Sequence, residues 1–169
     1  ATNETELLLR TSGDARVPER LYDQVLDSPS NLVLLDTPFP DELLAHMRQM
    51  SQRRGHSIYA WDAEKGLASL REHGITVAGS KRLAEALRFV LQSGHFGVYV
   101  FPAERSEYTP QVLALLRQIA RGKEGGDKRV VLLGTAIKIP ALGVLGRTVV
   151  HRHGPSDRLR MRDGRWVRG

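Results

Sequence analysis

The chain has 169 residues, of which 41% are hydrophobic and 26% are charged. This balance is typical of one globular domain and excludes a disordered or fibrous protein. The chain has no cysteine, which excludes disulfides, thiolate zinc sites and cysteine nucleophiles. Its formal net charge is +6, and the last 18 residues supply +4 of it because they hold six arginines and two aspartates. This end of the chain is therefore expected to attract an anionic partner.

The first part of the chain, residues 1–30, is predicted to be a peripheral helical segment. Residues 4–10 are amphipathic, and further along Leu21, Val25 and Leu26 share one helical face. The beginning of the chain has only a short apolar run beside acidic residues, so neither a signal peptide nor a membrane span is predicted. We expect a cytoplasmic protein.

Short apolar runs that alternate with helical patterns predict an α/β fold. The candidate strands cover residues 31–36, 57–60, 96–101, 129–134 and 147–151. Helices are predicted from Asp41 to just before Gly55, over a short stretch at 64–71, over 80–91 with Ser80 as the N-cap, and over 110–121. Parallel neighbours need crossover connections, so the alternation predicts a three-layer, doubly wound, mostly parallel five-stranded sheet.

The C-terminal tail has a different period. Charged and apolar residues alternate over 158–162, Asp163-Gly164 is typical of a type I′ turn, and the alternation returns over 165–168. A β-hairpin is predicted, with Leu159 and Met161 against the body of the domain and the arginines on the other face. The predicted organisation is thus 1–30 peripheral, 31–153 α/β core and 154–169 basic hairpin, all within one structural domain.

Ligands of open parallel sheets bind outside the carboxyl ends of the strands. The candidate ligand-binding residues at these ends are Asp36, Trp61, Asp62, Glu104, Thr135 and Lys138. A phosphate-binding fold would have a glycine-rich loop with Lys and Ser or Thr after the first core strand. Residues 36–40 read Asp-Thr-Pro-Phe-Pro instead, with no glycine and with two prolines that lack an N–H. No triphosphate site of that type is predicted.

No catalytic residue, metal site or cofactor is predicted. Glu104 is the one acid in the Phe-Pro-Ala-Glu segment after the third strand, where magnesium chemistry would use an acidic pair. Asp36 and Asp62 would make a carboxylate pair only if they met, and Asp at a strand end is more often a turn or cap residue. His151 and His153 have the spacing of metal ligands, but the neighbouring arginines repel a cation. No Gly-x-Ser-x-Gly elbow is present.

Several segments, in their order, resemble the N-terminal domain of the Ycf-type AAA ATPases of bacteria, cyanobacteria and chloroplasts. The segments are Ser57-Ile-Tyr-Ala-Trp-Asp62 with Gly66-Leu67, Lys81 to Val90, Gly97-Val-Tyr-Val-Phe101, and Val130-Val-Leu-Leu-Gly134 leading to Ile137-Lys-Ile-Pro140. The resemblance spans about residues 31–153 and implies an AAA- or RecA-like core without a phosphate loop. Family members usually have a polar pair where this chain has Pro102-Ala103, and no Gly-Lys-Ser/Thr sequence occurs here. The resemblance therefore implies a non-catalytic domain that stands alone, without the ATPase module.

The leading functional prediction is a protein-interaction or assembly module. A second interpretation is a nucleic-acid-binding module, since guanidinium groups contact phosphates and an indole stacks on bases. The residues predicted to bind an anionic partner are Arg152, Arg158, Arg160, Arg162, Arg165, Trp166 and Arg168. A third interpretation is a nucleotide sensor or enzyme with its ligand at the strand ends. A solvated edge hairpin that guards against aggregation would explain the arginines equally well.

Overall fold

A computed structural model describes residues 16–103, 108–122, 128–143, 146–151, 159–162 and 165–168, with the side chains of the last two ranges excluded. The amphipathic segment 4–10, Glu104, Arg152, His153, Arg158 and the turn at 163–164 lie outside these residues. Of the helices described, none combines the length and the apolar character that a membrane span needs.

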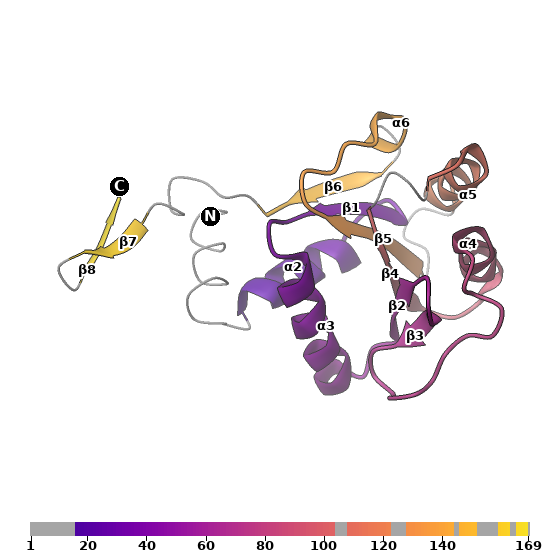
Figure 1. Cartoon of the computed structure of the whole chain (residues 1–169), viewed down its shortest axis with the longest axis horizontal. Helices are drawn as coiled ribbons and strands as arrows, with labels where there is room; N and C mark the ends of the chain where they lie inside the picture. The colour runs from indigo at the N-terminus through magenta and orange to yellow at the C-terminus, as the bar shows by residue number, and fades with distance from the viewer. Residues whose placement is uncertain are drawn as a thin grey trace.

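The described core is a sheet with the strand order β3-β2-β4-β5-β1-β6. The strands are β1 (Leu32–Asp36), β2 (Ile58–Asp62), β3 (Gly66–Ser69), β4 (Gly97–Pro102), β5 (Lys128–Gly134) and β6 (Arg147–Val150). All neighbours are parallel except β2 and β3. The order is consistent with a RecA-like arrangement, and the mostly parallel α/β sheet that the sequence predicts is confirmed (Figure 1).

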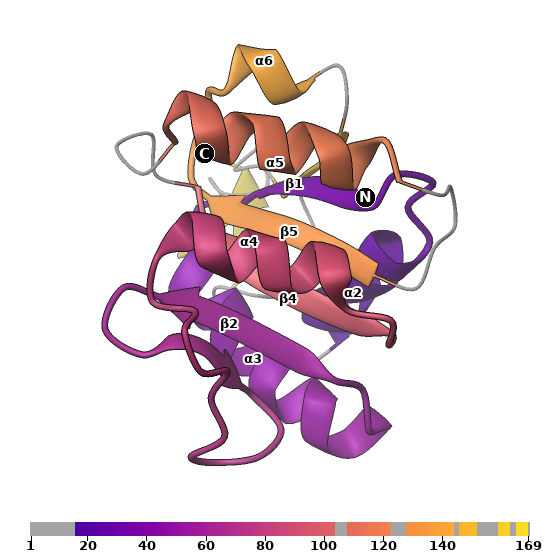
Figure 2. The same ribbon diagram turned by 90° about the vertical axis from the view of Figure 1, so that its right-hand side faces the viewer.

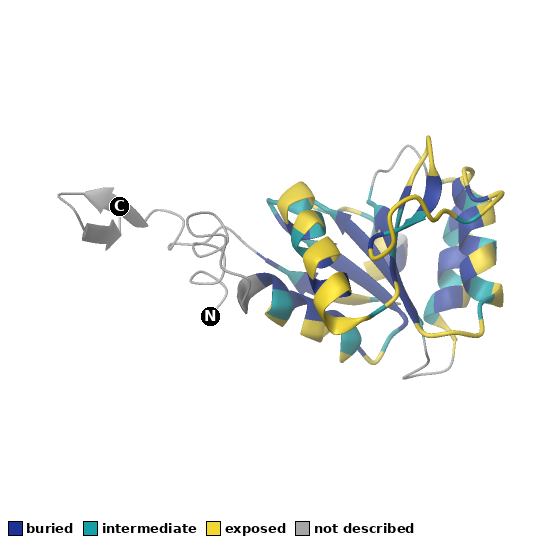
Figure 3. Cartoon of the chain, turned by 90° about the horizontal axis from the view of Figure 1, so that it is seen from below, coloured by how far each residue is buried: buried dark blue, intermediate teal, exposed yellow. Residues whose placement is uncertain are grey.

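Helices cover both faces of this sheet. They are α2 (Arg16–Leu26), α3 (Pro40–Arg54), α4 (Leu83–Gln92), α5 (Pro110–Ala120) and the short α6 (Pro140–Gly143). Figure 2 shows α4 and α5 in front of the strands and α2 and α3 behind them. Each face has its own cluster of buried apolar side chains, and the central strands β4, β5 and β1 between them are almost fully buried (Figure 3). The predicted three-layer architecture is confirmed.

The ends of α3 and α5 follow from local sequence. Pro40 begins α3, two acidic residues occupy its first turn, and Gly55 ends it with a φ of 70° while its N–H donates to the Ser51 carbonyl. At α5 the Thr109 side chain accepts a hydrogen bond from the Val112 N–H, and a proline again follows the cap. Both helices lie where the sequence predicts them.

The segment after β2 differs from the prediction. The sequence pattern predicted a short helix over 64–71, whereas Gly66–Ser69 forms β3, antiparallel to β2. The Asp62 carboxylate accepts hydrogen bonds from the Glu64 and Lys65 N–H groups, which turns the chain back immediately. The sheet therefore has six strands rather than the predicted five.

The sequence predicts Ser80 as the N-cap of α4. In the structure its side chain instead binds the backbone of β3 and of the segment that follows it. Its buried hydroxyl donates to the Val77 carbonyl at 2.6 Å and accepts from the Leu67 N–H at 2.9 Å. Gly66 has a φ of +75°, and a Cβ there would lie 2.4 Å from the Ser80 Oγ. The contact of Ser80 with β3 therefore replaces the helix-capping role that its residue type favours. The helix α4 begins at Leu83, and its N-cap residue Arg82 makes no side-chain hydrogen bond to the helix.

Two consecutive cations at the start of β5 cap the ends of helices on opposite faces. The Lys128 Nζ donates to the carbonyls of Val90, Leu91 and Ser93 at the end of α4. The buried Arg129 guanidinium donates to the carbonyls of Val25 and Leu26 at the end of α2 and to the Asn31 Oδ1. Successive residues of a strand point to opposite faces, so one dipeptide serves both helix layers.

The prediction of a peripheral segment over 1–30 needs correction for α2. Leu21, Tyr22 and Val25 are buried in the same apolar cluster as α3. The shared helical face that the sequence shows is therefore a core face. It is also tied to the sheet through Arg129.

The predicted C-terminal hairpin is present as backbone. The strands β7 (Leu159–Arg162) and β8 (Arg165–Arg168) pair antiparallel, with Arg162 opposite Arg165. They form a two-stranded sheet of their own. Their side chains, including the predicted contacts of Leu159 and Met161, lie outside the described part.

Candidate binding site at the carboxyl ends of the strands

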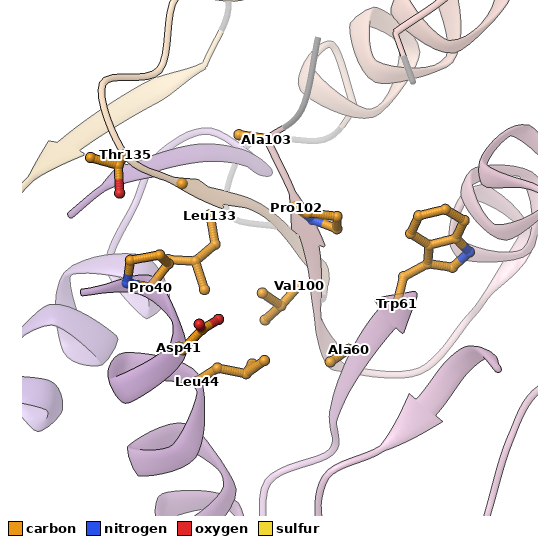
Figure 4. Close-up of a pocket in the computed structure, with 11 residues that line it drawn as sticks. Pro40, Asp41, Leu44, Ala60, Trp61, Val100, Pro102, Ala103, Leu133 and Thr135 are labelled. Carbon is orange, nitrogen blue, oxygen red and sulfur yellow. The ribbon is translucent and has the colours of Figure 1, made fainter. Parts of the chain in front are cut away.

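A cavity of about 350 Å³ lies where the carboxyl ends of three strands meet the first turn of α3. Its lining residues are Pro40, Asp41, Leu44, Ala60, Trp61, Val100, Pro102, Ala103, Leu133, Gly134 and Thr135. Figure 4 shows Asp41 and Leu44 on α3 facing Ala60 and Val100 on the strands. Asp41 is the one charged residue in the lining, whose other side chains are apolar except for Thr135, although polar atoms also form a substantial part of the cavity surface.

The cavity lies beside the junction between β1 and α3, and residues 37–40 of this junction have no backbone donor left for a phosphate. The Thr37 N–H donates to the Gly134 carbonyl at 2.8 Å, and the Phe39 N–H donates to the Thr37 Oγ1 at 3.1 Å. Pro38 and Pro40 have no N–H. A phosphate loop works through several backbone N–H groups aimed at the ligand, and residues 37–40 offer none.

The carboxylate of Asp36, at the end of β1, is hydrogen-bonded to the backbone of the protein through both of its oxygens. Its two carboxylate oxygens accept hydrogen bonds from the N–H groups of Ala136 and Ile137, both at 2.9 Å. Ala136 has a φ of 52°, in the left-handed region that is unfavourable for a residue with a Cβ. Asp36 therefore holds a strained turn after β5 and has no free oxygen directed at a ligand.

His151, just after β6, closes the other side of this junction. Its ring is buried and its Nδ1 lies 3.1 Å from the Thr37 Oγ1, while its backbone N–H donates to the Asp36 carbonyl. Among the described residues, the buried Nε2 has no hydrogen-bond partner. Burial lowers the pKa of His151 to about 4, so the ring is neutral at physiological pH.

The first turn of α3 is negatively charged. Asp41 and Glu42 are both exposed there, and within the described ranges the Asp41 carboxylate has no ion-pair partner. A helix N-terminus carries a partial charge of about +0.5, which two carboxylates exceed. The entrance to the cavity therefore has the wrong sign for a phosphate and the right sign for a cation.

The structure brings Asp36 and Thr135 together at the ends of the adjacent strands β1 and β5, but Asp62 ends β2, which β4 and β5 separate from β1. Trp61 and Thr135 line the cavity, although the Trp61 ring points to the other face of the sheet, where its Nε1 donates to the Ser80 carbonyl (Figure 4). Lys138 is exposed. The Asp36 carboxylate binds backbone N–H groups of the turn after β5, and the Asp62 carboxylate binds those of the turn that follows β2.

Most residues of the cavity carry no sequence signal of a binding site. Asp41 was predicted as a favourable residue for a helix N-terminus, and the floor residues Ala60, Val100 and Leu133 as ordinary strand residues. The available signal was positional, because alternate residues of β2, β4 and β5 share the face that packs on α3. Their small or short side chains leave space below Leu44.

A second cavity, also of about 350 Å³, is basic and more open. It is lined by Lys65, Lys81 and Arg82 with Glu85, together with the loop 76–79. Glu85 is already paired with Arg88. In the described part of the chain, no three side chains of His, Asp or Glu are grouped so that they could hold a metal ion.

The comparison with family models agrees with this geometry. Residues 19–151 match the model described as the SpoVK-like AAA ATPase, N-terminal domain. The chain belongs to this family. The match begins within α2 and ends at His151, so the domain includes the helix that Arg129 ties to the core. No curated protein matches the chain.

Proposed function

We propose that this AAA ATPase N-terminal domain is a non-catalytic module that binds a polypeptide partner in the cavity between α3 and the strand ends. One observation carries the proposal. Where a nucleotide-binding relative of this fold would present phosphate donors, the chain presents a cavity lined mainly by apolar side chains, with a carboxylate at its rim. Apolar cavities with a few polar groups are typical ligand sites, and this one has room for a large side chain.

Nucleotide binding is disfavoured by the same geometry. The backbone N–H groups of Thr37 and Phe39 are engaged, Asp36 is bound to the turn after β5, and Asp41 repels phosphate. We expect Mg-ATP and Mg-ADP at millimolar concentration to leave the unfolding midpoint unchanged. A clear rise in the midpoint would favour the nucleotide sensor that the sequence leaves open.

The polypeptide prediction is tested by selecting peptides from a random nine-residue library on the purified chain. Ala60→Leu is the matched control, because Ala60 lines the cavity and the larger side chain fills it without changing any charge. Peptides that bind the native chain at least tenfold more tightly than the control support the proposal. If no peptide distinguishes the two proteins, the proposal fails, provided that circular dichroism shows the control to be folded.

A second candidate function is nucleic-acid binding through the arginine-rich tail. The antiparallel pairing of β7 with β8 favours it, because a hairpin places alternate residues on one face. We expect a gel shift with DNA or RNA that weakens steeply with salt and is lost on changing Arg160, Arg162 and Arg165 to alanine. The absence of a shift at low salt would remove this candidate.

A further inference from the structure

We infer that the group bound in this cavity is an arginine or lysine side chain of the partner polypeptide. The methylene stem would lie along the apolar lining, and the cationic head would meet the Asp41 carboxylate at the rim. This inference rests on the proposed function and adds the chemistry of the occupant.

Asp41 is placed and available for this contact. It lies one turn before Leu44, so the two side chains share the face of α3 that lines the cavity (Figure 4). No ion pair involves its carboxylate within the described residues. The nearby Asp36 carboxylate, in contrast, is bound by two N–H groups and directed into the turn after β5.

Charge decides which kind of head group fits. The positive end of α3, about half an elementary charge, is outweighed by the two carboxylates of its first turn. An anionic group would add a further like charge. A purely apolar group would leave the Asp41 carboxylate at the rim without a partner, so it would gain nothing from this charge. A cation avoids the repulsion and pairs with the carboxylate.

The lining suits the stem of a long cationic side chain. Ala60, Val100 and Leu133 come from three adjacent strands and offer only aliphatic surface on this face. Arginine and lysine bury their methylene groups on such surfaces while their charged ends remain near the rim. The favoured segment is therefore an arginine or lysine with apolar neighbours.

The peptide selection described above tests this inference when it is repeated on two variants. Asp41→Asn removes the charge at the rim, and Glu42→Gln removes the same charge from the next residue, which does not line the cavity. Library members that also bind Ala60→Leu are discarded, because they bind other surfaces such as the tail. Peptides selected on the native chain are then measured on all proteins by fluorescence anisotropy.

The expected result has three parts. Cavity-dependent peptides are enriched several-fold in arginine or lysine, Asp41→Asn weakens them about tenfold, and Glu42→Gln weakens them less than threefold. If cavity-dependent peptides are found without basic enrichment, or if they bind Asp41→Asn as tightly as the native chain, the inference is wrong while the proposed function stands. If no peptide depends on the cavity, both fail. Asp41→Lys, which should select acidic peptides instead, provides an independent check.

Discussion

The two ends of the parallel strands use their charged residues in different ways. At the amino end, Lys128 and Arg129 are each bound to several carbonyls and hold α4 and α2 in place. At the carboxyl end, Asp36 is equally engaged, but Asp41 borders a cavity and has no ion pair in the described part of the structure. A charge satisfied by the backbone indicates a structural role. For the charge at the rim of the cavity, we propose a role in binding.

The largest effect is expected at the amino end. Arg129→Met removes the donor that the Leu26 carbonyl and the Asn31 Oδ1 share, and it leaves the Val25 carbonyl with the Ser28 N–H alone. Since each unsatisfied buried acceptor costs about 1–3 kcal/mol, the free energy of unfolding should fall by about 3–5 kcal/mol. Urea denaturation measures this loss.

Arg53→Met is the control for Arg129→Met. Arg53 forms an exposed ion pair with Glu19 at 2.9 Å, and such pairs contribute about 0–1 kcal/mol. If the two variants lost the same free energy, the structural role assigned to the amino end would be wrong.

The next effect concerns pH at the carboxyl end. His151 has a folded-state pKa of about 4, below its usual value of 6.5, so the unfolded chain binds more protons between these values. The free energy of unfolding should therefore be constant above about pH 7 and fall as the pH drops toward 4, by up to about 3 kcal/mol. Denaturation at a series of pH values measures this slope.

His151→Asn, which cannot titrate but can still reach Thr37, should flatten most of that pH dependence. His56 contributes to what remains, because burial, together with Arg54, also lowers its pKa. An NMR titration of the native chain gives the His151 pKa directly. A value near 6.5 would contradict the burial that the structure shows.

A smaller loss of stability is expected at Asp36. Asp36→Asn keeps one acceptor oxygen but removes the partner of either the Ala136 or the Ile137 N–H. The loss should be about 1–3 kcal/mol, since a backbone donor is left unpaired and the left-handed Ala136 loses support. Thermal unfolding measures it. No loss at all would mean that Asp36 does not hold this turn.

The sequence predicts the order and type of most helices and strands of this domain well. It predicts less well which residues contact one another. Strands such as 31–36 and 129–134 are apolar runs that only a doubly covered sheet explains, and Pro40 and Gly55 mark α3 locally. β3 and the role of Ser80 were missed because both depend on a contact with Gly66, which no local propensity encodes. The cavity was missed for a related reason: it consists of space left by residues from four elements.

The smallest effect on stability is expected at Asp41, and it makes the comparison with Asp36 direct. The same Asp→Asn change, at the same end of the sheet, removes no hydrogen bond that the structure describes and only one favourable charge at a helix N-terminus. The free energy of unfolding should therefore change by less than about 1 kcal/mol. Measured side by side, Asp36→Asn should lower stability with little effect on cavity-dependent peptides, and Asp41→Asn should do the reverse. If both carboxylates affected stability alike, Asp41 would be a structural residue as well, and the cavity would lose its argument for a cationic occupant.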